Sequence, residues 1–234
     1  MQQEAWSSYA EGRDLLYAER WAEAEQPLRA ALRLDPLMPL ARYGLGQVYM
    51  VLKRYPEAVE EFAACRETFA CFATAEAERR LDQESRTLNE TIRGLERDYL
   101  VRTRIPGQEA NKEPPPSKGE TIRRVGQLEA RLAELQRWKK RMRKGHAAPP
   151  EVTLALGTAY FQSGSLGDAE REYKAALGLD SEMGDAHNNL AVVYLATGRL
   201  EESEREVGLA EKAGIPVAPR LKEELRRRRQ DQSK

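Results

Sequence analysis

Few residues in this 234-residue sequence are of the types that usually carry catalysis. The two histidines are His146, in a Gly-His-Ala-Ala-Pro-Pro stretch, and His187. The sequence has no glycine-rich phosphate loop, no strained serine elbow and no paired-histidine zinc motif. Carboxylates are numerous, but they occur in runs such as Glu57, Glu60 and Glu61, which are typical of solvated helix faces. We therefore predict that the chain is not an enzyme and binds no cofactor.

The two cysteines, Cys65 and Cys71, do not have the spacing of a metal site. They are six residues apart rather than in a Cys-x-x-Cys motif, and a zinc quartet would need more cysteine or histidine ligands nearby. Cys65 stands at a position that other parts of the chain fill with alanine, so we expect a small buried side chain there. The sequence predicts no metal site.

Two basic clusters could contact phosphate groups. Residues 137–144 hold six basic side chains around Trp138, and residues 226–229 are four consecutive arginines. Basic residues next to an aromatic ring can bind nucleic acid, with the ring stacking on a base. Both clusters also fall near expected helix C-termini, where cations are favoured, and 38 basic residues balance 38 acidic ones. We favour the helix-end explanation, and RNA, DNA or an acidic protein patch remain the alternatives.

The elements that position these residues recur with a period of 34. Gly12, Ala24, Leu28 and Ala31 return as Gly46, Ala58, Phe62 and Cys65, and the set Leu156, Gly157, Tyr160 and Ala176 returns as Leu190, Ala191, Tyr194 and Ala210. Each unit of this length is a helix pair too thin to bury its own apolar face, so it must stack on its neighbours. The glycine leaves a gap that lets the second helix approach, and Phe62 fills the space beside Gly46. Asp35-Pro36 is expected to end the second helix.

This pattern resembles the tetratricopeptide repeat. Four copies fit, starting near residues 5, 39, 150 and 184. The resemblance implies an all-α solenoid of helix pairs at residues 5–72 and 150–217. The stretch at residues 218–229 is amphipathic and follows Gly214 and Pro216, so we expect a capping helix there.

A different element interrupts the repeats, because Gly46 and Gly157 are 111 residues apart, which is not a multiple of 34. Apolar residues follow heptad spacing in two stretches. The first seam is Leu81, Leu88, Ile92, Leu95 and Tyr99, and the second is Val125, Leu128, Leu132, Leu135 and Met142. We predict a long antiparallel helical hairpin (a coiled coil) at residues 73–146, with a proline-rich loop at residues 104–119.

The family resemblance also implies which side chains line a concave groove. In the N-terminal repeat pair, and among the asparagines of the C-terminal pair, the expected binding residues are Trp6, Tyr9, Arg13, Tyr17, Tyr43, Gln47, Met50, Asn188 and Asn189. The C-terminal pair further offers Leu154, Thr158, Phe161, Gln162 and Val192. Tyrosine, tryptophan, arginine and methionine are enriched at protein interfaces. We expect an exposed aromatic strip in the N-terminal half, with packing of those rings against the hairpin or against neighbouring helices as the alternative.

The function that follows is a non-enzymatic scaffold that binds a protein or peptide segment in the groove. Arg13 would favour an acidic segment, because a guanidinium makes two parallel bonds to a carboxylate. The alternative is a structural or assembly subunit that self-associates through the hairpin seam. Since no run of 18 apolar residues is present, we expect no membrane insertion and a cytoplasmic protein by default. A mature exported chain whose leader has been removed is the alternative.

Overall fold

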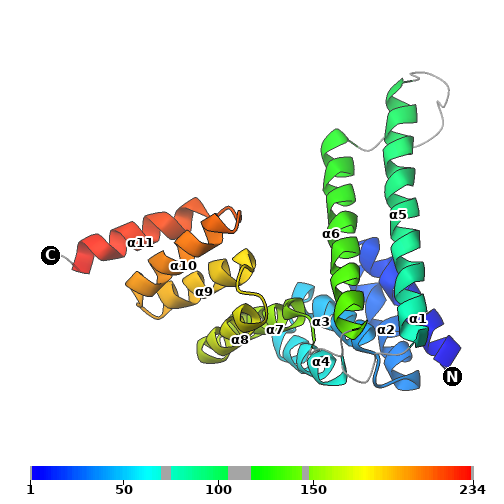
Figure 1. Cartoon of the computed structure of the whole chain (residues 1–234), viewed down its shortest axis with the longest axis horizontal. Coiled ribbons are helices and arrows are strands. Elements are labelled where there is room, and N and C mark those ends of the chain that lie inside the picture. The colour runs from blue at the N-terminus through cyan, green and yellow to red at the C-terminus, as the bar shows by residue number, and fades with distance from the viewer. Residues whose placement is uncertain (1, 70–74, 105–116, 144–147, 233–234) are drawn as a thin grey trace. The chain divides into compact units, whose positions relative to one another are not determined.

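The computed structural model describes residues 2–69, 75–104, 117–143 and 148–232, which hold eleven α-helices and no strand (Figure 1). The prediction of an all-α fold built from helix pairs is confirmed. The helices are α1 (Gln2–Tyr17), α2 (Trp21–Leu34), α3 (Pro39–Val51), α4 (Tyr55–Thr68), α5 (Ala75–Arg104), α6 (Lys118–Arg143), α7 (Pro150–Gln162), α8 (Leu166–Leu179), α9 (Gly184–Ala196), α10 (Leu200–Lys212) and α11 (Pro219–Gln232). None of these described helices is long and apolar enough to cross a membrane.

The chain divides into two compact units, and the larger one contains residues 1–69 and 147–234. In this unit α1 packs on α2, α3 on α4, α7 on α8 and α9 on α10. The pairs also pack on each other through α2 and α3, α4 and α7, and α8 and α9. Although α5 and α6 lie between them in the sequence, α4 and α7 are direct neighbours. The four helix pairs therefore form one continuous stack.

Close helix approach at small residues holds each pair together, as the repeat period predicts. A Cβ atom added at Gly46 would lie 2.5 Å from Cε1 of the Phe62 ring, which is 1% exposed. Gly12 faces Leu28 and Gly157 faces Tyr173 in the same way. No side chain larger than hydrogen fits at Gly46 without movement of the ring, so the predicted pairing of a gap with a bulky residue is confirmed.

Asp35 ends α2 as expected, and its carboxylate accepts a hydrogen bond from the backbone N–H of Leu37 at 3.1 Å. Asp180 plays the same part after α8, where it accepts from the N–H of Glu182 at 3.1 Å. Between the second and third pairs, Nη1 of Arg66 lies 2.7 Å from a carboxylate oxygen of Glu172. This ion pair adds to the apolar contact of α4 with α7.

Helix α11 covers the end of the stack. Its residues Leu221 and Leu225, with Val217 before it, join a buried cluster that also contains Val207 and Ala210. Polar contacts also attach α11 to the neighbouring helices. Arg229 pairs with Glu204, and Lys222 pairs with Glu211. Arg228 donates to the carbonyl oxygen of Leu195 at 2.9 Å. Two members of the arginine cluster at residues 226–229 thus bind neighbouring helices of the chain.

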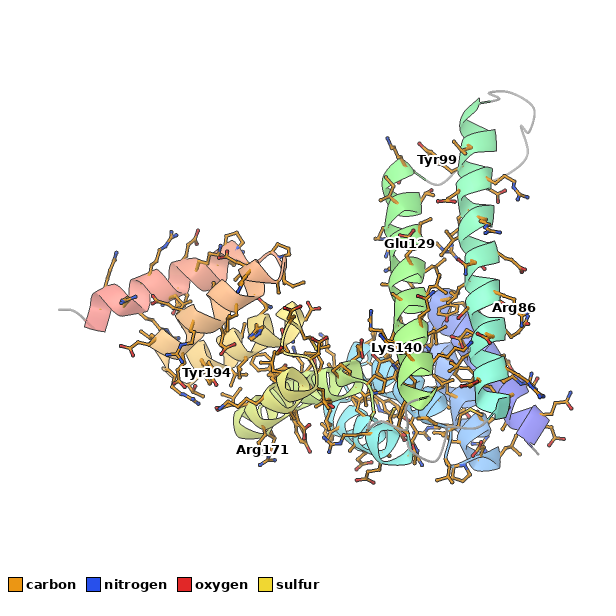
Figure 2. All side chains as sticks on the ribbon, in the orientation of Figure 1. Arg86, Tyr99, Glu129, Lys140, Arg171 and Tyr194 are labelled. Atoms are coloured by element: carbon orange, nitrogen blue, oxygen red, sulfur yellow. The ribbon has the colours of Figure 1, made fainter. Side chains whose placement is uncertain are left out.

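The smaller unit contains residues 70–146. Helices α5 and α6 pack side by side, and the seam residues Leu81, Leu88, Ile92, Leu128 and Leu135 are buried. The carboxylate of Glu84, only 2% exposed, lies 3.5 Å from Nη2 of Arg131. Figure 2 shows Arg86 on the flank of α5 that faces away from α6. Most of the loop predicted at residues 104–119 lies outside the described residues.

The burial of Trp138 does not fit nucleic-acid binding by the basic cluster at residues 137–144. In that alternative the Trp138 ring stacks on a base, which requires an accessible ring face. The ring is fully buried at 0% exposed. Trp138 follows Leu135 by three residues, so it lies near the apolar seam of the helix rather than on its solvated side. It is therefore not available to stack on a base.

Candidate functional site

Three of the four rings expected to form an exposed N-terminal strip are buried. Trp6, Tyr9 and Tyr43 are 7, 3 and 7% exposed. Trp6 and Tyr9 meet edge to face with ring centroids 5.7 Å apart, and Tyr43 packs against Phe62 at 5.6 Å. The expectation of exposure at these positions is wrong, because a place on a first helix sets the direction of a ring but not what packs against it. At all three positions the packing alternative describes the rings better.

The other N-terminal groove candidates remain partly accessible. Arg13, Tyr17, Gln47 and Met50 are all half-buried. The guanidinium of Arg13 donates to the Asp14 carboxylate at 2.7 and 3.0 Å, and it lies 6.0 Å from the Tyr17 ring centroid. The arginine that suggested an acidic partner therefore already has a carboxylate beside it.

The C-terminal helix pairs contain a half-open pocket of about 110 Å³. It lies between the first helices of the third and fourth pairs, with a second-helix residue at its floor. Its lining consists of Thr158, Phe161 and Gln162 from α7, Tyr173 from α8, and Asn189 and Val192 from α9. Five of these six residues were expected in the groove from the sequence. Tyr173 was not, because it lies on a second helix.

The pocket floor is a buried tyrosine with satisfied polar contacts. Tyr173 is 1% exposed, and its hydroxyl donates to Oγ1 of Thr158 at 3.3 Å. Burial raises the pKa of Tyr173, and hydrogen bonding with Thr158 and Asn189 only partly opposes this, so the phenol stays neutral at physiological pH. The amide of Asn188 in turn donates to Oδ1 of Asn189 at 3.4 Å. At the rim, Gln162 is exposed to solvent. None of the six lining residues carries a charge.

The equivalent place in the N-terminal pairs is filled by apolar side chains. Residues 145 positions earlier replace Asn189 by Gly44, Phe161 by Leu16 and Tyr173 by Leu28. A Cβ atom added at Gly44 would lie 3.2 Å from Cδ1 of both leucines. The glycine lets α1 approach α3, and the two leucines occupy the space that is open in the C-terminal pairs.

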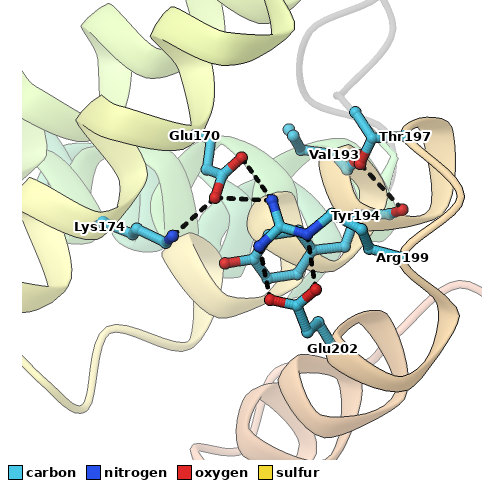
Figure 3. A network of polar contacts seen from close by, with 7 residues as sticks. All are labelled: Glu170, Lys174, Val193, Tyr194, Thr197, Arg199 and Glu202. Atoms are coloured by element: carbon cyan, nitrogen blue, oxygen red, sulfur yellow. Dashed lines mark hydrogen bonds and ion pairs between the residues drawn. The ribbon is translucent and has the colours of Figure 1, made fainter.

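A cluster of charged residues links the third and fourth pairs (Figure 3). Nη1 of Arg199 lies 2.8 Å from Glu170, and its Nε donates to Glu202 at 2.6 Å. The guanidinium also lies over the Tyr194 ring, 4.2 Å from the centroid, and Lys174 donates to Glu170 at 2.6 Å. We call this cluster the C-terminal arginine clamp. Because Glu170 belongs to α8 and Glu202 to α10, the clamp ties consecutive second helices together.

The clamp shifts the pKa values of its own members. Burial by itself would raise the pKa of Glu170, but hydrogen bonds from Lys174 and Arg199 outweigh it, and the pKa is lowered. The hydrogen bond from Arg199 lowers the pKa of Glu202, and the same bond raises the pKa of Arg199. All these groups are ionised near neutral pH, so the clamp is a set of charged contacts rather than an acid–base pair.

The N-terminal pairs carry a matching clamp. Arg54 contacts Glu25 at 3.1 Å and Glu57 at 2.9 Å, and lies 4.4 Å from the centroid of the Tyr49 ring. A fifth member, Arg29, stands at the position of Lys174 and donates to the Tyr49 hydroxyl at 2.8 Å. Each residue lies 145 positions before its counterpart. The 34-residue comparison of single repeats missed the clamp, and a comparison of the two repeat pairs at an offset of 145 would have found it.

A further equivalent pair differs in chemistry. Arg42 donates to Glu61 at 3.1 Å and to the carbonyl oxygen of Pro36 at 2.8 Å. His187 occupies the same place in the C-terminal pairs, with Nδ1 2.6 Å from Glu206 and Nε2 3.1 Å from the carbonyl oxygen of Ser181. At 8% exposed, the His187 side chain is buried. Burial raises the pKa of Glu61, against the opposing effect of Arg42.

The remaining candidate chemistry is limited. Cys65 is fully buried beside the repeat core, and Cys71 lies outside the described residues. Among the residues with described positions, no three histidine, cysteine or carboxylate side chains are placed to hold a metal ion.

Comparison with known proteins identifies similar chains. A family model described as "Tetratricopeptide repeat" matches residues 9–68 and 154–219, just over half of the sequence. Among solved structures, pilF of Pseudomonas aeruginosa is 17% identical over 92% of this chain and 79% of its own, with a TM-score of 0.31. TTC0263, a thermophilic TPR protein of Thermus thermophilus, is 18% identical over 96% and 98%, with a TM-score of 0.28. The TPR domain of P58(IPK) is 17% identical over 97% and 64%, with a TM-score of 0.31. No curated protein matched the sequence.

Proposed function

Because this chain belongs to the tetratricopeptide repeat family, whose members are generally protein-interaction scaffolds, we propose that it binds a segment of another protein in its groove. We place the binding site in the C-terminal half, between α7 and α9. In this reading the stack is a rigid support, and the chain performs no chemistry of its own.

One observation carries the choice of the C-terminal half, namely the contrast between the two ends of the groove. Trp6, Tyr9 and Tyr43 are buried at one end, whereas the pocket beside Asn189 is open to solvent at the other. A partner needs concave, accessible surface with a few polar groups to fix its orientation. The pocket offers both an apolar wall, from Phe161 and Val192, and neutral polar groups.

The uncharged lining bears on the kind of partner. An acidic segment was expected from Arg13, but the Asp14 carboxylate already accepts its hydrogen bonds. A charged side chain entering the C-terminal pocket would lose water without gaining an opposite charge. We propose that the bound segment is neutral where it meets this pocket.

Quantitative capture of proteins from a lysate of the source cells tests the location. Val192→Phe places a ring in the pocket, and Gln47→Phe makes the same change at the equivalent N-terminal position. We expect the proteins captured by the wild-type chain to be lost from Val192→Phe and retained by Gln47→Phe, with both variants melting like the wild type. Retention by both variants would overturn groove binding, and loss from Gln47→Phe alone would move the site to the N-terminal half.

The alternative is an assembly subunit that pairs with a second copy through the hairpin seam. Leu88, Ile92, Leu128 and Leu135 already pack within one chain, so pairing between copies would require the two arms to separate. Light scattering on the full chain and on a variant lacking residues 102–144 distinguishes the two functions. A dimer that becomes monomeric on this deletion would favour the assembly subunit, and a monomer throughout would favour the scaffold.

A further inference from the structure

We infer that the pocket between α7 and α9 receives one aliphatic side chain of an extended peptide segment, and that Gln162 and Asn189 hold the main chain on either side of it. The inference rests on the proposed groove function and adds the chemistry of the occupant. Three features of the pocket support it: its volume, the character of its walls, and the type of polar group at its rim.

The volume restricts the occupant to a single side chain. Sites for drug-sized molecules and cofactors measure roughly 300–1,000 Å³, several times the 110 Å³ found here. An apolar cavity of roughly 150 Å³ accepts one benzene-sized group. The pocket is smaller than this, so it favours leucine, isoleucine, valine or methionine over the larger rings of phenylalanine and tryptophan.

The walls favour an apolar group over a polar one. Phe161 and Val192 are half-buried and pack against the two buried apolar clusters of the C-terminal pairs. The Tyr173 hydroxyl at the floor already donates to Thr158, so it has no second proton to offer an incoming group. A serine or asparagine side chain in the pocket would exchange its bonds to water for few new ones, while an aliphatic chain gains from leaving water.

The polar groups at the rim are carboxamides. A carboxamide both donates and accepts hydrogen bonds, as a peptide group does, so the two can pair in a two-bond arrangement. Gln162 is exposed, and its side chain makes no hydrogen bond or ion pair with the residues that the structure describes, which leaves both ends of its carboxamide available to a partner. Oδ1 of Asn189 accepts a hydrogen bond from Asn188 at 3.4 Å, so Asn189 is oriented before a partner arrives. The rim therefore suits the main chain of an extended segment rather than a helix, whose peptide groups are already bonded.

A peptide library tests the inference with the full-length protein. The probe is a bead-bound library of nine-residue peptides with blocked termini and random residues at every position. We expect the selected peptides to share leucine, isoleucine, valine or methionine at one position. Replacing that residue with alanine should weaken binding about 10- to 100-fold, because an aliphatic side chain is returned to water.

Variants of the protein complete the test. Val192→Phe, and Gln162→Trp at the exposed rim as a second variant, should each abolish binding of the selected peptides, while Gln47→Phe should not. Peptides that depend on Val192 and Gln162 but share an aromatic or charged residue would overturn the aliphatic occupant and leave groove binding intact. Peptides that bind all three variants equally would overturn the pocket as the site. If no peptide is enriched, an extended segment is not the occupant, and the capture experiment still decides the proposed function separately.

Discussion

The two repeat pairs of this chain share one framework and differ in the groove it supports. Arg54 and Arg199 each bridge two glutamates over a tyrosine ring, with contacts of 2.9–3.1 Å at Arg54 and 2.6–2.8 Å at Arg199. At the first-helix surface the likeness ends, because Gly44 with its two leucines closes the space that Asn189 and its neighbours leave open. Because the clamps match and the grooves differ, we propose that stability and recognition are carried by separate sets of residues.

The two repeat pairs also fill the space between a first and a second helix with different side chains. Gly46 and Phe62 of the N-terminal pairs correspond to Ala191 and Val207 of the C-terminal pairs. A larger residue on the first helix is matched by a smaller one on the second, so the summed volume is similar. Volume-conserving exchanges of this kind are the ones that packed cores tolerate best.

The largest effect on stability is expected when only one residue of the Gly46 and Phe62 pair is replaced by its C-terminal counterpart. Gly46→Ala brings a Cβ to 2.5 Å from the Phe62 ring and should cost about 1–3 kcal/mol. Phe62→Val removes a ring that is 1% exposed and should cost at least ~2 kcal/mol. The double variant copies the C-terminal pair and should lose at least ~1 kcal/mol less than the sum.

Urea unfolding of the full chain, followed by circular dichroism, measures the cycle. Ala191→Gly is the control in the C-terminal pairs, where the helix propensity of glycine, about 1 kcal/mol, and the loss of one buried methyl group, ~0.8 kcal/mol, should appear. If the losses in free energy of unfolding are additive in the double variant, the two residue pairs are not equivalent packing arrangements.

A smaller effect on the free energy of unfolding is expected from changes at His187, which occupies the place of Arg42 in the C-terminal pairs. His187→Ala leaves the Glu206 carboxylate and the Ser181 carbonyl oxygen without their partner and should lower the free energy of unfolding by ~1–3 kcal/mol. His187→Arg should recover most of the loss, since Arg42 makes the same two contacts in the N-terminal pairs. Thermal melts of the three proteins make the comparison. If arginine is as harmful as alanine at this position, the two places are not interchangeable.

The smallest effect concerns pH and the two clamps. Hydrogen bonds from Arg54 and Arg199 lower the pKa of Glu57 and Glu202 in the folded chain. Stability from these carboxylates is therefore complete above their unfolded pKa of about 4.3, and it is lost as pH falls through the lower folded values. Glu57→Gln and Glu202→Gln should each flatten the acid side of the stability curve to a similar, small extent. A clear effect of only one variant would show that the clamps are not equivalent.

The sequence predicted the parts of this fold that depend on spacing along a helix. Gly46 and Phe62 were assigned correctly because their roles follow from a period of 34 and from the size of each side chain. Asn189 was placed in the groove only by what the family resemblance implied. The spacing alone could not show that Tyr9 and Tyr43 are covered, because burial depends on what packs against a helix face.

The pocket was also beyond the sequence, although most of its lining was named. It exists because Phe161, Tyr173 and Asn189 together leave a volume that Leu16, Leu28 and Gly44 do not. That volume is a property of three helices packed together, and Tyr173 enters it from α8 rather than from a groove helix. The clamps were missed for a simpler reason, since they recur with the repeat pair and not with the single repeat.

Site-specific photocrosslinking tests most directly the claim that recognition occurs in the C-terminal half. A photoreactive phenylalanine analogue is placed at the exposed Ala196, one helical turn after Val192 on α9, in one full-length protein and at Val51, its counterpart 145 residues earlier, in another. After illumination in lysate, mass spectrometry identifies and quantifies the adducts. We expect a specific protein adduct from position 196 that Val192→Phe removes, and none from position 51. An adduct from position 51 with none from position 196 would contradict recognition in the C-terminal half.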